Sequence, residues 1–256
     1  MIEKSRLDVY LVNMGLASSR NHAQDLIDSG QVYLIENGGR KMLKKASLLV
    51  SSHIQIEVEK GPANKYVSRG GLKLEGALIH TRLSLKSWSV LDVGISTGGF
   101  TDCLLQSGVD YVLGVDVGHG QVHSSLIQNK KLRIIERVNA RELSQCVDVI
   151  EATPKNKFDL IVMDVSFISI GLIIPELPKF LKSGGYLLSL VKPQFEVGID
   201  GLSKGGIVKN EALYEKVENK IKEVCALYGF QALDYFSSSI TGKDGNHEFF
   251  ILAKKD

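Results

Sequence analysis

The 256-residue sequence has few cysteines, no long apolar run and almost no excess charge. Its three cysteines lie far apart without a CxxC pair, which argues against a zinc site or disulfide framework and fits a reducing cytoplasm. Lys, Asp or Gly interrupts every hydrophobic stretch before the roughly 18 residues that a membrane span needs. The opening MIEKSRLDVY lacks the apolar segment of a signal peptide. We therefore expect neither a membrane-spanning nor a secreted protein.

What remains is the composition of a folded globular protein. Hydrophobic residues make up 44% and charged residues 23%, so a sizeable core can form. The net charge is only +2, so any contact with nucleic acid depends on where the cations lie rather than on their sum. A chain of this length accommodates one small domain and one larger domain.

The first segment, residues 5–59, is predicted to form two short helices followed by strands. Apolar residues recur at helical spacing on both sides of a glycine turn, and the second run ends at Gly30, a common residue after helix ends. Ser18 and Ser19 offer an N-cap for that second helix. The pattern then changes to the alternation of strands. The apolar residues concerned are Leu7, Tyr10 and Leu11, then Ala23, Leu26 and Ile27, then 32–35, Ile54, Ile56 and Val58.

From about residue 65, apolar strands alternate with helices, which is typical of a parallel sheet covered by helices on both faces. The end of the chain departs from this pattern. A helix near 211–228 precedes two strands at 233–237 and 248–253, which predict a hairpin at the end of the sheet. The expected parallel strands are Ser89–Val93, 111–115, 133–136, 160–163 and 186–191.

A glycine loop, GISTGGFT, follows the first of these strands. Its spacing matches neither the dinucleotide nor the phosphate-loop pattern, but fits the looser loop of S-adenosylmethionine enzymes, whose ligand has no phosphate. About twenty residues later Asp116 ends the next strand, where an acid suits ribose hydroxyls. A structural turn with an exposed Asp is the alternative. The predicted cofactor-binding residues are Asp92, Gly94, Ser96, Thr97, Gly98, Gly99, Phe100 and Asp116, with Asn139 near the adenine.

Six ordered motifs in this second segment carry a family resemblance. DVGISTGGFTDCLLQ, GVDVGHGQ, VNAR, MDVSFIS, VKPQFEVG and GNHEFF together resemble the TlyA family, historically called haemolysin A, which is related to the FtsJ/RrmJ-type ribosomal RNA 2′-O-methyltransferases. The N-terminal SRLDVYL…ASSRNHAQDLIDSGQVYL resembles an S-four-type RNA-binding domain. The resemblance spans nearly the whole chain.

The resemblance implies a fold and an activity. The fold is α/β, a class I (Rossmann-like) methyltransferase sheet with helices on both faces and an antiparallel last strand, preceded by a small α+β RNA-binding domain. We expect these domains at residues 1–60 and 67–256, joined by a linker at 61–66. The implied activity is methylation of a ribose 2′-hydroxyl of ribosomal RNA, at cytidine, by S-adenosyl-L-methionine. Ribosomal subunits are the implied partners, and the enzyme would be cytoplasmic.

The FtsJ-like group carries a Lys-Asp-Lys-Glu set, which falls here on Lys73, Asp164, Lys192 and Glu248. A ribose hydroxyl must lose its proton as it attacks, and lysine accepts a proton only when neutral, against a reference pKa of about 10.4. We therefore expect Lys192 to be the general base and Lys73 to be the cation that favours a neutral amine and orients the substrate. Asp164 would fix the amine, and Glu248 would steer Lys73 or the ribose.

The positions of these residues agree with this chemistry independently of the resemblance. Asp92, Asp116, Asp164 and Lys192 each follow an apolar strand, so they converge at the carboxyl edge of a parallel sheet, where ligands bind. Structural alternatives stay open: a lysine there is usually a solvated strand end, and Asp164 could cap a following helix. Phe195 could stack on a base or pack in the core.

In the first segment, cations could meet phosphate groups, with a solvated face balanced by Asp25 and Asp28 as the alternative. The predicted RNA-binding residues are Arg6, Arg20, Lys41, Lys44 and Lys45.

Three other functions compete with RNA methylation. The first is a membrane-active cytolysin. The sequence argues against it, because it contains neither a membrane-spanning segment nor a strongly amphipathic cationic helix. The second is an inactive ribosome-assembly factor, and the third is a methyltransferase for protein or small molecules. No metal site is expected, because His119 and His123 have no third ligand nearby in the sequence.

Overall fold

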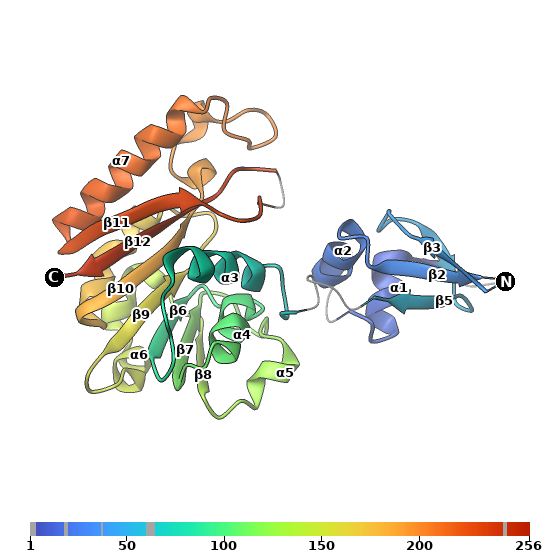
Figure 1. Ribbon diagram of the computed structural model, residues 1–256, viewed down its shortest axis with the longest axis horizontal. Helices are drawn as coiled ribbons and strands as arrows, with labels where there is room; N and C mark the ends of the chain where they lie inside the picture. Colours follow the sequence, from blue (N-terminus) through green and yellow to red (C-terminus); the bar gives the residue numbers. More distant parts are fainter. Residues whose placement is uncertain (1–3, 18–19, 37, 60–64, 243–244) are drawn as a thin grey trace. The chain divides into compact units, whose positions relative to one another are not determined.

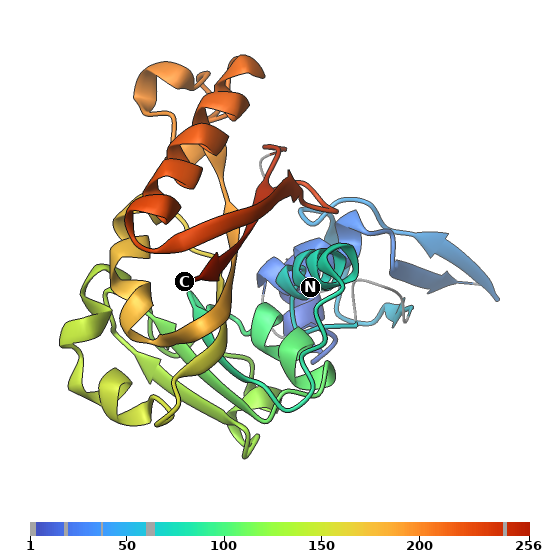
Figure 2. The same cartoon turned by 60° about the vertical axis from the view of Figure 1, so that its left-hand side comes forward.

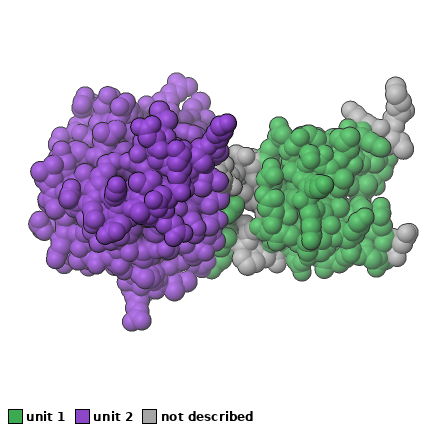
Figure 3. Space-filling view, turned by 90° about the horizontal axis from the view of Figure 1, so that it is seen from above, with its two compact units in different colours: residues 1–72 green, residues 73–256 purple. Residues whose placement is uncertain are grey.

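The computed structural model describes residues 4–17, 20–36, 38–59, 65–242 and 245–256. The chain divides into two compact units, residues 1–72 and 73–256, which Figure 3 colours separately. The division falls inside helix α3 (Gly70–Thr81), after the linker predicted at 61–66. Residues 61–64 of that linker lie outside the described residues, as do Ser18 and Ser19, the predicted N-cap.

The smaller unit packs two helices against short antiparallel strands (Figure 1). Strand β2 lies between β3 and β5 in a three-stranded sheet, and β1 pairs separately with β4. Both predicted helices form, and Arg20 begins the second one. The elements are β1 (Lys4–Arg6), α1 (Leu7–Asn13), α2 (Arg20–Asp28), β2 (Val32–Glu36), β3 (Gly39–Met42), β4 (Leu49–Ser51) and β5 (Gln55–Val58).

Helical periodicity explains the core of this unit. Ala23, Leu26 and Ile27 lie on one face of α2 and are almost fully buried, together with Leu7 and Leu11 of α1. The β1–β4 pair was not predicted, because strands of three residues carry too little alternation to be recognised. The unit is therefore the small α+β domain that the sequence led us to expect.

The larger unit is built on a seven-stranded sheet with the order β11-β12-β10-β9-β6-β7-β8. The five strands from β6 to β10 are parallel, and β12 runs antiparallel to both β10 and β11. This confirms the α/β class and the antiparallel last strand. The strands are β6 (Ser89–Val93), β7 (Tyr111–Asp116), β8 (Leu132–Glu136), β9 (Phe158–Met163), β10 (Leu181–Val191), β11 (Phe230–Ser237) and β12 (Phe249–Lys255).

Helices cover both faces of this sheet, as predicted. On one face, α6 (Val147–Ala152) and α7 (Ala212–Leu227) contribute to the core that contains Ile251 of β12. On the other face, Phe100 of α4 (Gly99–Gln106) stacks on Phe250, the next residue of the same strand. Because successive strand residues point to opposite faces, the helices lie on opposite sides. Figure 2 shows α7 and α3 on the two sides of β12.

The remaining elements of the larger unit are one short α-helix and several 3-10 helices in the segments between the strands. None of the described helices is long and apolar enough to cross a membrane. The short elements are helix α5 (Ser124–Ile127) and the 3-10 helices η2 (Ala140–Gln145), η3 (Ile170–Leu172), η4 (Ile174–Lys179), η5 (Pro193–Phe195) and η6 (Ile199–Gly201).

Candidate active site and nucleic-acid interface

The glycine loop after β6 makes close backbone contact with both neighbouring strands. The N–H groups of Gly94 and Ile95 donate to the carbonyl of Val115 at 2.8 and 3.1 Å. Gly94 has a φ of +86°, and a Cβ there would come within 2.6 Å of the carbonyl oxygen of Asp164. Only glycine permits this approach, so the loop lies directly beside the end of β9.

The loop continues into the N-terminus of α4. Gly98 is the N-cap residue with a φ of +96°, and as a glycine it has no side chain to cap the helix. Gly99, Phe100 and Thr101 form the first turn, whose backbone N–H groups have no acceptor within the helix. Such a helix start favours a negatively charged ligand group, for example a carboxylate.

Asp116 lies at the end of β7 and is bonded to the same loop. Its Oδ2 accepts a hydrogen bond from Ser96 N at 2.8 Å, and its Oδ1 accepts one from Gly118 N at 2.7 Å. The half-buried carboxylate is thus fixed and keeps lone pairs for ligand hydroxyls. Asn139, after β8, caps η2 through an Oδ1 that accepts from Arg141 N at 3.1 Å.

Asp92 is a fully buried carboxyl group under the loop. Thr101 Oγ1 donates to its Oδ2 at 2.7 Å, whereas its Oδ1 has no hydrogen-bond partner among the described residues. Burial raises the pKa of Asp92 to about 7. The Thr101 hydrogen bond acts in the opposite direction, and the negative charges of Asp164 and Asp116 add to the rise. The acidic groups and the backbone N–H groups at the start of α4 fit S-adenosylmethionine, which carries an ammonium, a sulfonium and a carboxylate.

Lys192 and Asp164 form an ion pair at the carboxyl ends of β10 and β9. Their Nζ and Oδ1 atoms lie 2.6 Å apart, with only 10% of the lysine side chain and 22% of the aspartate side chain exposed. Lys192 Nζ also donates to Ser166 Oγ at 2.8 Å. Lys192 is therefore not a solvated strand end, and Asp164 contacts it rather than capping a helix.

Lys73 of α3 forms the second lysine–carboxylate pair. Its Nζ lies 2.5 Å from Glu248 Oε2, and both side chains are nearly buried. Glu248 directly precedes β12, and the register pairs Val191 with Phe249. Lys192 directly follows Val191, and Glu248 directly precedes Phe249, the residue paired with Val191. Both ion pairs therefore lie at the same edge of the sheet.

Two aromatic side chains lie close to the Lys192 pair. Phe167 is 91% exposed, has a φ of +65° and lies one residue after Ser166. Its ring centroid is 5.2 Å from that of the half-buried Phe195 in η5. Phe195 could be considered from the sequence, but Phe167 and Ser166 could not, because neither exposure nor a left-handed backbone can be read from the MDVSF motif.

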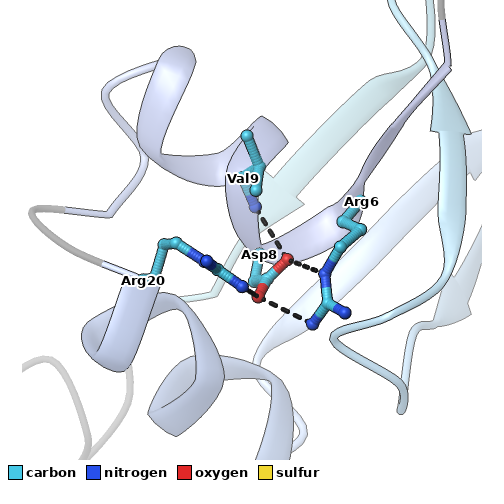
Figure 4. A network of polar contacts seen from close by, with 4 residues as sticks. All are labelled: Arg6, Asp8, Val9 and Arg20. Atoms are coloured by element: carbon cyan, nitrogen blue, oxygen red, sulfur yellow. Dashed lines mark hydrogen bonds and ion pairs between the residues drawn. The ribbon is translucent and has the colours of Figure 1, made fainter.

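The cations predicted to bind RNA fall into two groups. Arg6 and Arg20 converge on the buried carboxylate of Asp8, each with an N–O distance of 3.0 Å (Figure 4). The guanidinium of Arg6, joined by that of Arg20, holds the pKa of Asp8 well below its usual range. Both arginine side chains stay about half exposed, at 45% and 62%. Asp8, which the sequence did not single out, thus binds both arginines.

The second group is the lysine trio, which lies on β3 and in the turn after it. Lys41, Lys44 and Lys45 are exposed, as a phosphate-contacting role requires. Arg6 and Arg20 have Asp8 as a carboxylate partner. The side chain of Asp25, one of the two acids in the alternative of a balanced face, lies outside the described residues.

The histidines have other contacts than a metal. His119 Nδ1 lies 2.6 Å from Glu136 Oε2, and His123 caps α5. Across the described residues, no group of three or more His, Cys, Asp or Glu side chains could hold a metal ion.

The sheet order with its antiparallel last strand defines the Rossmann-like methyltransferase class. An S-adenosylmethionine-dependent methyltransferase from Mesorhizobium loti shares this fold at 12% identity, with a TM-score of 0.51 over 70% of this chain and 96% of that chain. The chain belongs to the FtsJ-like methyltransferase family, whose model matches residues 66–255. An S4 domain model matches residues 5–34 of the smaller unit.

Relatives with curated names align along nearly the whole chain. The Bacillus subtilis protein YqxC is 39% identical over 97% of this chain and 85% of its own length. Hemolysin A of Brachyspira hyodysenteriae is 38% identical over 95% of this chain and 97% of its own length. The 16S/23S rRNA (cytidine-2′-O)-methyltransferase TlyA of Mycobacterium tuberculosis is 35% identical over 98% of this chain and 90% of its own length.

A solved structure of similar sequence also covers the chain. A candidate hemolysin from Streptococcus thermophilus is 36% identical, with a TM-score of 0.74 over 100% of this chain and 90% of that chain.

Proposed function

We propose that this protein transfers the methyl group of S-adenosylmethionine to a ribose 2′-hydroxyl of ribosomal RNA. The observation that carries the proposal is the Lys192–Asp164 ion pair, which lies at the carboxyl edge beside the Gly94 loop. S-adenosylmethionine supplies a methyl group on a sulfonium, which an oxygen nucleophile displaces in line. Such a displacement needs alignment and a proton acceptor, and Lys192 in its neutral form is the acceptor at this edge.

Each residue of this edge has a role in the proposal. The first turn of α4 and Asp116 contact the methyl donor, and the buried Asp92 supports this site from beneath the loop through Thr101. Lys192 Nζ accepts the proton of the ribose hydroxyl, and Asp164 stabilises the ammonium that results, as a carboxylate stabilises the imidazolium in a serine hydrolase. Lys73, held by Glu248, orients the ribose from the other side.

The substrate is proposed from the relatives and from the smaller unit. The TlyA protein of Mycobacterium tuberculosis is named for cytidine methylation in 16S and 23S rRNA, and that of Campylobacter jejuni for 23S rRNA. We propose that this chain also methylates a cytidine in a ribosomal subunit. A ribosomal substrate implies a cytoplasmic enzyme. The S4 domain, with Arg6 and Arg20 at its surface, supplies the RNA contact.

The domain assignment is part of the same proposal. Residues 1–60 form the RNA-binding domain and residues 67–256 the methyltransferase domain, with 61–66 as the linker. The family match at 66–255 and the S4 match at 5–34 agree with this division. The ion pairs at the strand ends support methyl transfer rather than membrane lysis as the function.

The experiment offers labelled-methyl S-adenosylmethionine and separate ribosomal subunits from a strain that lacks the gene. Wild type is run beside Lys192→Ala, with cofactor binding measured for both by calorimetry. We expect label in RNA ribose with wild type alone and similar cofactor affinity for both. Cofactor binding without label in any subunit or free rRNA would exclude the ribosomal substrate. Lysis of cells that depends on Lys192 would instead support the cytolysin.

A further inference from the structure

The amine of Lys192 has two oxygen contacts that differ in kind. Ser166 Oγ accepts a hydrogen bond from Nζ at 2.8 Å, whereas Asp164 Oδ1 lies 2.6 Å away as the charged partner of an ion pair. An ion pair depends on distance more than on direction, whereas a hydrogen bond weakens steeply when it is bent. The contact with Ser166 is thus the directional one.

The backbone around Ser166 is held in place from two other elements. Glu196, just after η5, accepts hydrogen bonds from Ser169 Oγ at 2.6 Å and from Ile170 N at 2.8 Å. Lys220 of α7 donates to the same buried carboxylate at 2.9 Å. Phe167 adopts a left-handed φ of +65°, which is rare for a bulky residue and turns the chain directly after Ser166. Strain of this kind persists where the surrounding structure enforces it, often at functional sites.

We propose that Ser166 is a positioning residue that directs the lone pair of Lys192 toward the substrate hydroxyl. A neutral amine nitrogen is tetrahedral, with one bond to carbon, two to hydrogen and one lone pair. When one N–H points to Ser166 Oγ, two tetrahedral directions remain for the second hydrogen and the lone pair. Asp164 Oδ1 accepts no hydrogen bond among the described residues, but its negative charge favours the second hydrogen on its side, so the lone pair points away from both oxygens. This inference rests on the proposed function.

The proton transfer then balances. The ribose O–H bond breaks and its proton joins the lone pair of Lys192, which becomes an ammonium. The ribose oxygen bonds the methyl carbon, and the electron pair of the C–S bond stays on sulfur, which becomes a neutral thioether. Ser166 contacts neither the ribose nor the methyl donor in this scheme, so its loss affects the rate through the orientation of Lys192 alone.

The test compares Ser166→Ala with Ser166→Thr, which keeps the hydroxyl. Single-turnover methylation should fall about 10- to 100-fold in Ser166→Ala, a range below that of a lost general base. The KM for RNA and the affinity for S-adenosylmethionine should stay unchanged, and Ser166→Thr should keep most of the rate. Equal unfolding midpoints for the three proteins would show that the fold is intact.

A second readout needs no methyl donor. Nitrogen-15 NMR of lysine ammonium groups, with the Lys192 signal assigned by its loss in Lys192→Arg, reports how fast the amine protons exchange with water. The signal should be sharp in wild type and Ser166→Thr and broadened in Ser166→Ala, because an ammonium without its acceptor exchanges faster.

Three outcomes would overturn the proposal. These are a wild-type rate in Ser166→Ala, an equally sharp Lys192 signal in Ser166→Ala, or a higher KM for RNA with unchanged kcat. The last would make Ser166 a substrate contact. If wild type itself methylates no rRNA, the proposed function fails, and the NMR comparison still decides whether Ser166 orders Lys192.

Discussion

Lys73 Nζ and Glu248 Oε2 lie 2.5 Å apart although 175 positions separate the two residues in the sequence. The pair joins α3 to the start of β12, and both side chains are largely removed from water. Taking one partner from such a pair leaves an uncompensated charge in a poorly solvated place, whereas removing both does not.

The pair therefore predicts an asymmetry in stability. Glu248→Leu should lower the free energy of unfolding by about 3–5 kcal/mol, because Lys73 then remains buried and unpaired. The double variant Glu248→Leu/Lys73→Met should recover most of that loss. Urea unfolding of wild type, Glu248→Leu, Lys73→Met and the double variant measures the cycle. Single and double variants of equal stability would show that the pair is not coupled in this way.

Asp92 predicts a specific pH dependence of stability. Its pKa is raised from 3.8 to about 7 mainly by burial, so between these values the folded protein keeps a proton that the unfolded chain releases. The unfolded state binds fewer protons in this window, so the free energy of unfolding falls as pH rises from about 4 to 7 and levels off above.

Asp92→Asn should remove this dependence. Relative to that variant, wild type should lose on the order of 3 kcal/mol of stability between pH 5 and pH 8, at about 1.4 kcal/mol for each unit of pKa shift. Urea unfolding at several pH values gives the difference. The control is Asp148→Asn on the surface of α6, which should follow wild type. A constant difference between wild type and Asp92→Asn across this range would contradict a raised pKa.

The Arg6–Asp8–Arg20 cluster predicts weaker RNA binding when a negative charge is removed. Asp8→Asn raises the net charge by one, which alone would favour RNA, yet it releases both arginines from their shared carboxylate. We expect the affinity for ribosomal RNA to fall several-fold. Asp28→Asn makes the same change of charge on the exposed end of α2 and should leave binding equal or slightly tighter.

Filter binding at several salt concentrations separates the effect of total charge from the effect of positioning the two arginines. Arg20→Ala should lower the slope of log affinity against log salt by about one, as for a lost phosphate contact. Tighter binding by Asp8→Asn, with the domain still folded by circular dichroism, would mean that total charge outweighs the geometry.

Phe167 predicts a base contact close to the amine of Lys192. An exposed aromatic ring next to a second ring offers a stacking surface, and stacking contributes about 1–3 kcal/mol per base. Phe167→Ala should therefore raise the KM for RNA about 5- to 100-fold at unchanged affinity for S-adenosylmethionine. The control is Ile150→Ala, which removes another exposed apolar side chain on α6. Equal KM values for the two variants would exclude stacking by Phe167.

The sequence predicted the parts of this protein that depend on local periodicity. Apolar runs revealed the five parallel strands. The two successive strands that follow the helix near 211–228 departed from the strand–helix alternation and revealed the hairpin of β11 and β12. The acids and the lysine after the strands could be placed at one edge, because parallel strands end on the same side of a sheet. Helix α3 and the β1–β4 pair were missed, because their boundaries carry no cap or alternation that stands out.

The tertiary structure decided which of these groups meet. The family resemblance placed Lys73, Asp164, Lys192 and Glu248 at one site and assigned Asp164 to the amine of Lys192. It left open whether Glu248 contacts Lys73 or the ribose, and the packing of α3 against the start of β12 pairs it with Lys73. Ser166 and Asp8 became visible only through their contacts, because a serine or an aspartate near a strand end or helix start is ordinary in sequence. Contacts between residues far apart in the chain depend on packing, and local pattern contains no record of packing.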